Sequence, residues 1–222
     1  MTGAGPVPGR WLRAHAHPAA GIEALSVARV GARVRGGLPP DPLRGYALRV
    51  ASAAGDATLA RRLRAHPGFV AALEAALARG APLLVDSRML AAGLDRRRLT
   101  RLGVAVRHPA AGARPGAGWP TATARAMANL LAAPDASGAV VAVGTAPTAL
   151  LVVLDALEAG LRPAAVVGLP CGFVAAAASK RGLQTAPVPW LTLPGARGGC
   201  AMAAAVLNGA LRRLLPPAYG AP

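Results

Sequence analysis

Residues 139–157 read AVVAVGTAPTALLVVLDAL, and this stretch decides the fold. The run AVVAV is apolar without alternation, as in a strand that is buried on both faces of a sheet. The turn GTAPT follows, in which Gly144 suits a tight bend and Pro147 suits the first turn of a helix. Because Gly144, Pro147 and Asp155 interrupt the stretch, we do not expect it to span a membrane. It predicts a strand, a turn and a helix in succession.

The same succession recurs along the chain. Five short apolar runs are bounded by turns, at residues 82–85, 104–107, 139–143, 164–167 and 188–193. Helix-like segments separate or follow them, at residues 87–102, 123–131, 148–159, 173–182 and 200–214. Earlier in the chain the pattern predicts helices only, at residues 22–34, 42–54 and 68–79. Strands that alternate with helices pair in parallel through right-handed crossovers, so we expect an α/β fold with a five-stranded, mainly parallel sheet.

The ends of the chain differ from this pattern. Residues 1–20 are rich in Pro, Gly and His and predict a disordered or loosely packed arm before one domain at residues 21–214 and a tail at residues 215–222. The start of the chain lacks the apolar segment of a secretory signal, which favours the cytoplasm. Cys171 and Cys200 form no CxxC pattern, so we expect neither a disulfide framework nor a metal site.

The net charge of +16 limits the possible partners. Basic surfaces bind nucleic acid, but aromatic residues make up only 3% of the chain and leave few stacking platforms for bases. Arginine outnumbers lysine 24 to 1, as GC-biased coding produces, so we expect no nucleic-acid partner. A polyanionic small molecule or an acidic partner fits the charge equally well.

The residues that follow the predicted strands are distinctive. Asp86 and Ser87 follow the first run, and Gly-containing turns follow three others, at residues 144–148, 168–172 and 195–200. In a parallel sheet these turns meet at the carboxyl edge, where ligands bind. Because the turns lead into helix N-termini, we expect anions to bind there.

Several residues of this edge have structural alternatives. Asp86 suits a ligand contact or a helix cap, and Lys180, the only lysine, reflects either a geometric need or chance. The GTAPT turn lacks the glycine spacing of a dinucleotide site, and it also suits a purely structural bend. The four histidines, His15, His17, His66 and His108, suit loop roles, since none forms a recognisable catalytic triad.

Four stretches together carry a resemblance to a known family. They read PGFVAALEAALARGAPLLVDSRML, VVAVGTAPTALLVVLDAL, PAAVVGLPCGFVAAAASKRGL and GARGGCAMAAAVLNGAL. In order and spacing they resemble precorrin-8X methylmutase over roughly residues 21–213. The resemblance implies a three-layer, flavodoxin-like α/β/α fold, a homodimer, and a polycarboxylate tetrapyrrole as substrate. It also implies an isomerase of cobalamin biosynthesis that needs no external cofactor and moves a methyl group from C11 to C12 of the ring, yielding hydrogenobyrinate or its cobalt-containing equivalent.

The sequence departs from several of the family's motifs. Ser52 occupies the position of the family's catalytic His, and a serine hydroxyl does not supply a proton as imidazolium does. Leu25-Ser26-Val27 occupies the position of the family's Arg-Ser-Phe motif, and residues 120–123 (PTAT) occupy that of its Asn-Thr-Arg-Ser motif. Ala178 replaces a Glu that precedes the Ser-Lys pair.

These departures leave two main hypotheses. The first is a methylmutase with Ser52 at the catalytic position, and the alternative is a homologue that binds a corrinoid without turnover; a protein-interaction role with a vestigial site is a weaker third. Under the first two we expect substrate contacts from thirteen residues: Ser26, Asp86, Thr121, Thr123, Gly144, Thr145, Pro147, Thr148, Ser179, Lys180, Gly198, Gly199 and Cys200.

Overall fold

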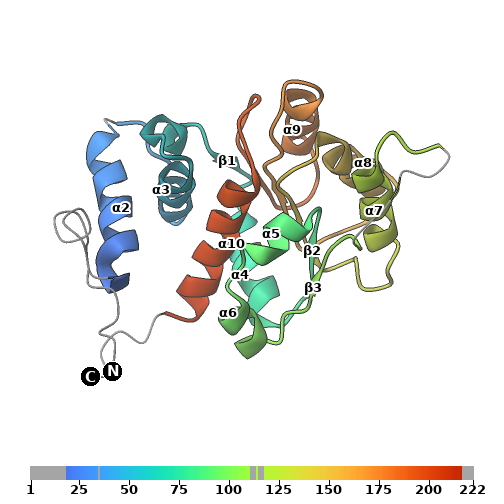
Figure 1. Cartoon of the computed structure of the whole chain (residues 1–222), viewed down its shortest axis with the longest axis horizontal. Helices are drawn as coiled ribbons and strands as arrows, with labels where there is room; N and C mark the ends of the chain where they lie inside the picture. Colours follow the sequence, from blue (N-terminus) through green and yellow to red (C-terminus); the bar gives the residue numbers. More distant parts are fainter. Residues whose placement is uncertain (1–18, 35, 111–113, 115–117, 217–222) are drawn as a thin grey trace, which may run out of the picture.

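The computed structural model describes residues 19–34, 36–110, 114 and 118–216, and its centre is a six-stranded sheet in the order β1-β6-β5-β4-β2-β3 (Figure 1). Five strands are parallel and confirm the five predicted runs: β2 (Leu83–Val85), β3 (Val106–Arg107), β4 (Val140–Val143), β5 (Ala165–Gly168) and β6 (Trp190–Thr192). The predicted strand number was wrong by one. The additional strand β1 (Arg64–Ala65) pairs antiparallel with β6 at one edge.

Helices cover both faces of the sheet, which confirms the three-layer α/β/α architecture. One face carries α3 (Leu43–Ala54), α4 (Phe69–Ala78) and α10 (Cys200–Leu214), and α2 (Ala19–Arg33) packs on α3. The other face carries α7 (Ala122–Leu131), α8 (Pro147–Glu158) and α9 (Ala176–Gln184). Alternate residues of β4 reach the two cores: Val140 and Ala142 pack with the first set of helices, and Val141 and Val143 with the second. Burial on both faces explains why the strands are uninterrupted apolar runs.

The helix predicted at residues 87–102 is instead two short helices. They are α5 (Arg88–Ala92) and α6 (Arg96–Arg101). Gly93 ends the first helix, and Asp95 begins the second because its carboxylate accepts a hydrogen bond from the backbone N–H of Arg98 at 3.1 Å. The helix predicted at 173–182 begins later, at Ala176, after a turn in which Ala175 has a φ of 61°.

Two further features frame the site. Asp56 caps the short 3-10 helix η1 (Ala57–Arg61) and accepts from the N–H of Thr58 at 3.0 Å. Glu23 of α2 forms ion pairs with both Arg49 of α3 and Arg212 of α10, which ties the outermost helix to the domain.

No helix of the described ranges is long and apolar enough to cross a membrane. The arm expected at residues 1–20 lies outside the described residues except for its last two, which belong to α2, and of the tail only residues 215 and 216 are described.

Candidate functional site

Asp86 organises the turn that follows β4. Its side chain is 1% exposed, and its Oδ1 accepts from the N–H of Gly144 at 3.1 Å. Its Oδ2 accepts from the N–H groups of Thr145 at 2.7 Å and Ala146 at 3.0 Å. These three amides were expected to bind an anionic ligand, but a carboxylate of the chain itself already occupies them. Asp86 does not cap the helix that follows it in sequence, α5; that cap is Ser87, whose Oγ accepts from the N–H of Leu90 at 3.2 Å.

Two hydroxyls and a thiol meet where β2, β4 and α10 converge. The Oγ1 of Thr145 lies 3.0 Å from the Oγ of Ser87 and 2.9 Å from the Sγ of Cys200, and the Oγ of Ser87 lies 3.4 Å from the same Sγ. Gly144 permits this approach, because a Cβ there would lie 3.0 Å from the Cα of Cys200. We call Ser87, Thr145 and Cys200 the hydroxyl–thiol cluster. It presents short polar groups at the carboxyl edge of the sheet.

Lys180 holds the loop that leads into α10. Its side chain is fully buried, and its Nζ donates to the backbone carbonyls of Gly195 at 2.9 Å and Arg197 at 2.5 Å. The only lysine of the chain therefore serves a geometric need. Ser179 is also fully buried, and its Oγ donates to the carbonyl of Ala176 at 3.1 Å. Both side chains are directed into the fold and support the carboxyl edge of the sheet through bonds to backbone carbonyls.

Two glycines of this loop, Gly198 and Gly199, fit its backbone for different reasons. A Cβ at Gly198 would lie 2.2 Å from the carbonyl oxygen of Leu169 and 2.4 Å from that of Pro170. Gly199 has a φ of 134° and donates its N–H to the same Leu169 carbonyl at 2.8 Å. A side chain at position 198 would separate this loop from the turn after β5, and one at position 199 would be strained by its positive φ.

We expect the stability of the folded protein to rise between pH 8 and pH 10 because of Lys180. Burial lowers the pKa of Lys180 from 10.5 to about 8, with a smaller opposing effect of Cys171 and a contribution of Arg62 in the same direction. Between these pKa values the unfolded chain binds more protons than the folded chain, so the free energy of unfolding rises with pH. Below pH 8 the amine is charged in both states, and burial of that charge destabilises the folded protein by its full amount.

Urea denaturation at pH 7.5, 9 and 10 checks this expectation. The variant Lys180→Met lacks the titrating amine and is expected to lose the rise, and so is Lys180→Arg, whose side chain stays charged. Parallel profiles for wild type and both variants would contradict the assignment. The window ends at pH 10 because the pKa of Tyr46 is raised by burial and by its hydrogen bond to Glu74, which adds an opposite slope above that pH.

Two further pairs of hydroxyl side chains form hydrogen bonds outside the hydroxyl–thiol cluster. Thr121 caps α7, and its Oγ1 lies 2.8 Å from the Oγ1 of Thr148 in the first turn of α8, just after Pro147 at the start of that helix. Thr123 lies in the same first turn of α7 and is half-buried. The Oγ of Ser26 lies 2.6 Å from the Oγ of Ser52, which connects α2 to the end of α3.

The Ser26–Ser52 pair lines a cavity of about 540 Å³ that also contacts Arg29 and Arg33. Within the chain, α2 and α3 lie on one side of α10, and α7 and α8 lie on the other (Figure 1). The sequence-predicted site residues therefore fall into three hydrogen-bonded groups: Ser26 with Ser52, the hydroxyl–thiol cluster with its supports, and Thr121 with Thr148, with Thr123 next to Thr121 along α7.

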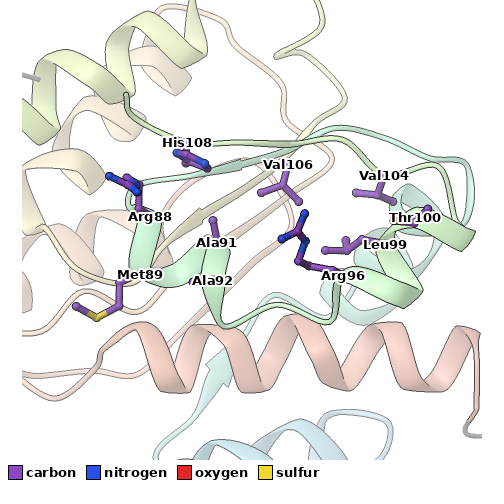
Figure 2. Close-up of a pocket in the computed structure, with 10 residues that line it drawn as sticks. All are labelled: Arg88, Met89, Ala91, Ala92, Arg96, Leu99, Thr100, Val104, Val106 and His108. Atoms are coloured by element: carbon purple, nitrogen blue, oxygen red, sulfur yellow. The ribbon is translucent and has the colours of Figure 1, made fainter. Parts of the chain in front are cut away.

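A second cavity, of about 710 Å³, lies between α5, α6 and the edge strand β3 (Figure 2). Its polar lining includes Arg88, Arg96 and His108. Sequence analysis did not single out the two arginines and gave His108 a loop role. The sequence gives a partial signal for two of these three residues: Arg88 and His108 each lie within three residues of the end of a predicted strand.

Comparisons with known proteins agree with this fold and these motifs. A sequence model described as precorrin-8X methylmutase matches residues 21–213, which include every expected site residue. The chain belongs to the precorrin-8X methylmutase family. The precorrin-8X methylmutase of Pseudomonas aeruginosa is 40% identical over 176 residues, covering 78% of this chain and 84% of that protein. The one from a Sinorhizobium species is 39% identical over 175 residues, covering 75% and 81%.

A solved structure of the family shows the same architecture. The precorrin-8X methylmutase of Thermus thermophilus is 35% identical and superposes with a TM-score of 0.79, covering 87% of this chain and 97% of that one. Family membership thus rests on both sequence and fold. The family of precorrin-8X methylmutases consists of isomerases, and relatives named cobalt-precorrin-8 methylmutase also match, for example 32% identity over 163 residues in Priestia megaterium.

Proposed function

We propose that this chain is an isomerase of corrin biosynthesis that converts precorrin-8X, or its cobalt-containing form, by moving one methyl group on the macrocycle. The observation that carries the proposal is the family match over residues 21–213, on a fold that brings the matching turns to one edge of the sheet. The names of the relatives favour catalysis over binding without turnover.

The reaction implied by the family is an intramolecular rearrangement, so every bond that breaks or forms belongs to the same macrocycle. The bond between C11 and its methyl group breaks, the bond from the same methyl to C12 forms, and a proton on the ring relocates. The protein's contribution is to hold one tautomer and to stabilise the charge distribution of the transition state. The proposed reaction uses no external cofactor.

We assign separate roles to the three groups of residues. The Ser52 hydroxyl donates a hydrogen bond to a ring nitrogen, and Ser26, 2.6 Å away, orients that hydroxyl. Ser87, Thr145 and Cys200 contact the polar periphery of the ring. Asp86, Ser179 and Lys180 are buried and act by positioning the turns, so we place them behind the substrate rather than in contact with it.

We also propose a homodimer in the cytoplasm as the working form. The helices α2 and α3, which carry the Ser26–Ser52 pair, and the helices α7 and α8, at whose starts Thr121 and Thr148 lie, are on opposite sides of α10 (Figure 1). A second copy would bring the Thr121 end of one chain toward the Ser52 end of the other around a single macrocycle. The net charge of +16 suits a ligand that carries many carboxylates.

Purified protein incubated with precorrin-8X tests the activity. The expected result is a change of the absorption spectrum to that of hydrogenobyrinate, with turnover slower than that of the Pseudomonas aeruginosa relative measured in parallel, because Ser52 cannot deliver a proton as imidazolium does. Binding of precorrin-8X with no spectral change over hours would identify a non-catalytic corrinoid-binding protein instead.

A further inference from the structure

The cavity beside β3 has an unusual lining. Three of its side chains carry or can carry positive charge, Arg88, Arg96 and His108, and no acidic residue lines it. The remaining lining is largely apolar: Met89, Ala91, Ala92, Leu99, Val104 and Val106. In Figure 2 the guanidinium of Arg88 lies beside the imidazole of His108, and that of Arg96 points between Ala91 and Val106.

Among the residues that the structure describes, the two arginines have no acidic partner. All nine acidic residues of the sequence lie in the described ranges, and six of them form ion pairs with other arginines. Neither Arg88 nor Arg96 takes part in any ion pair or side-chain hydrogen bond found among the described residues. Asp86, the acidic residue next in sequence to Ser87 and Arg88, is turned inward and bound to three amides. Both guanidinium groups are therefore available to an external anion.

The apolar lining runs from buried residues such as Leu99 to an exposed side chain at its rim, Met89. Met89 is 70% exposed although it is a large apolar side chain, and it lies next to Arg88 in α5. Methionine adapts its shape to flat or irregular apolar ligands. An apolar surface with cationic groups spaced along it matches a flat ring that carries carboxylates at its periphery.

The position of this cavity connects it to the proposed site. Ser87 of the hydroxyl–thiol cluster is the cap of α5, and Arg88 is the first residue of that helix. The Nδ1 of His108 lies 2.9 Å from the carbonyl oxygen of Pro109. In the imidazolium form both ring nitrogens donate, so Nδ1–H can bond that carbonyl while Nε2–H is left to donate to a carboxylate.

We propose that this cavity binds the carboxylates along one edge of the tetrapyrrole, with Arg88 and Arg96 as the principal contacts and His108 beside Arg88. The inference rests on the proposed function and adds the residues that recognise the charged periphery of the substrate. A cavity of about 710 Å³ accommodates a substantial part of such a ring together with its side chains.

Binding of hydrogenobyrinate, measured by absorbance titration of the full chain, tests the proposal. The variant Arg88→Ala/Arg96→Ala is expected to raise Kd by about 100-fold, since each lost charge-assisted contact weakens binding by about tenfold or more. The matched control is Arg97→Ala/Arg101→Ala, which removes the same charge from exposed positions of α6 outside the cavity. We expect the control to change Kd by about twofold at most, through the general field of the protein alone.

The outcomes separate this inference from the proposed function. Tight binding to wild type, with the same Kd in the cavity variant as in the control, overturns the cavity assignment and leaves the methylmutase proposal intact. An equal loss of affinity in both double variants shows a non-specific charge effect and also overturns the assignment. Absence of binding to wild type overturns the proposed function and the inference with it. Circular dichroism of each variant establishes that a change in Kd does not reflect unfolding.

Discussion

Replacing Ser52 with histidine is expected to raise kcat for precorrin-8X by about 10²- to 10⁴-fold, the range that general acid catalysis contributes. Ser52 lies in the last turn of α3 beside Ser26 and lines a cavity of about 540 Å³, so an imidazole has room without displacing the core. The gain appears in kcat rather than in KM, because the proton is needed only as the methyl group migrates.

The matched control is Ser52→Gln, which has a similar size and a hydrogen-bond donor but no titrating proton. We expect it to leave kcat within about tenfold of wild type. The pH profile gives a second readout: activity of Ser52→His should fall as the pH rises through about 6.5, while wild type lacks this limb. A histidine variant with wild-type kcat and an unchanged pH profile would show that this cavity does not hold the reacting ring.

Asp86→Ala is expected to lower the free energy of unfolding by at least about 3 kcal/mol. The substitution removes the charged acceptor of three backbone N–H groups: that of Gly144 is buried, and those of Thr145 and Ala146 lie at the partly exposed edge of the turn. For a chain of this length such a loss lowers Tm by about 6–12 °C. Calorimetry or thermal circular dichroism measures the shift.

Asp155→Ala serves as the control for charge. Asp155 lies exposed on α8, so the substitution changes the net charge equally without opening a buried site. We expect its Tm to stay within about 2 °C of wild type. If Asp86→Ala were as stable as Asp155→Ala, the three amide contacts would not hold the turn, and the carboxylate would be free for substrate.

Most of the fold could be predicted because both faces of the sheet are buried. Uninterrupted runs such as AVVAV marked β4 and its neighbours, and Gly55 marked the end of α3. Strand β1 escaped prediction because it has only two residues, and its partner β6 lies more than 120 residues later. The break between α5 and α6 was visible as Gly93 and Asp95, but the helical spacing of the surrounding residues outweighed those signals.

The site could be predicted only in outline. The sequence placed Asp86 and the GTAPT turn at the same sheet edge, but not the bond between them, because the amides that Asp86 binds lie 58 to 60 residues away. The role of the lone lysine depends on the carbonyls of Gly195 and Arg197, which lie 15 and 17 residues later and accept from its Nζ, so the sequence around position 180 does not reveal it. The cavity beside β3 draws its lining from α5, α6 and β3, and no local pattern joins Arg88, Arg96 and His108.

The two outer strands of the sheet have a consequence for the behaviour of the protein at high concentration. Both β1 and β3 are only two residues long, and β1 runs opposite to the rest. Such short edges offer few free N–H and C=O groups on which a strand of another molecule could grow. Arg64 in β1 and Arg107 in β3 place a charged side chain in each edge strand. We infer that the apolar strands of the centre, which have the composition of aggregation-prone segments, are shielded from edge-to-edge association between molecules.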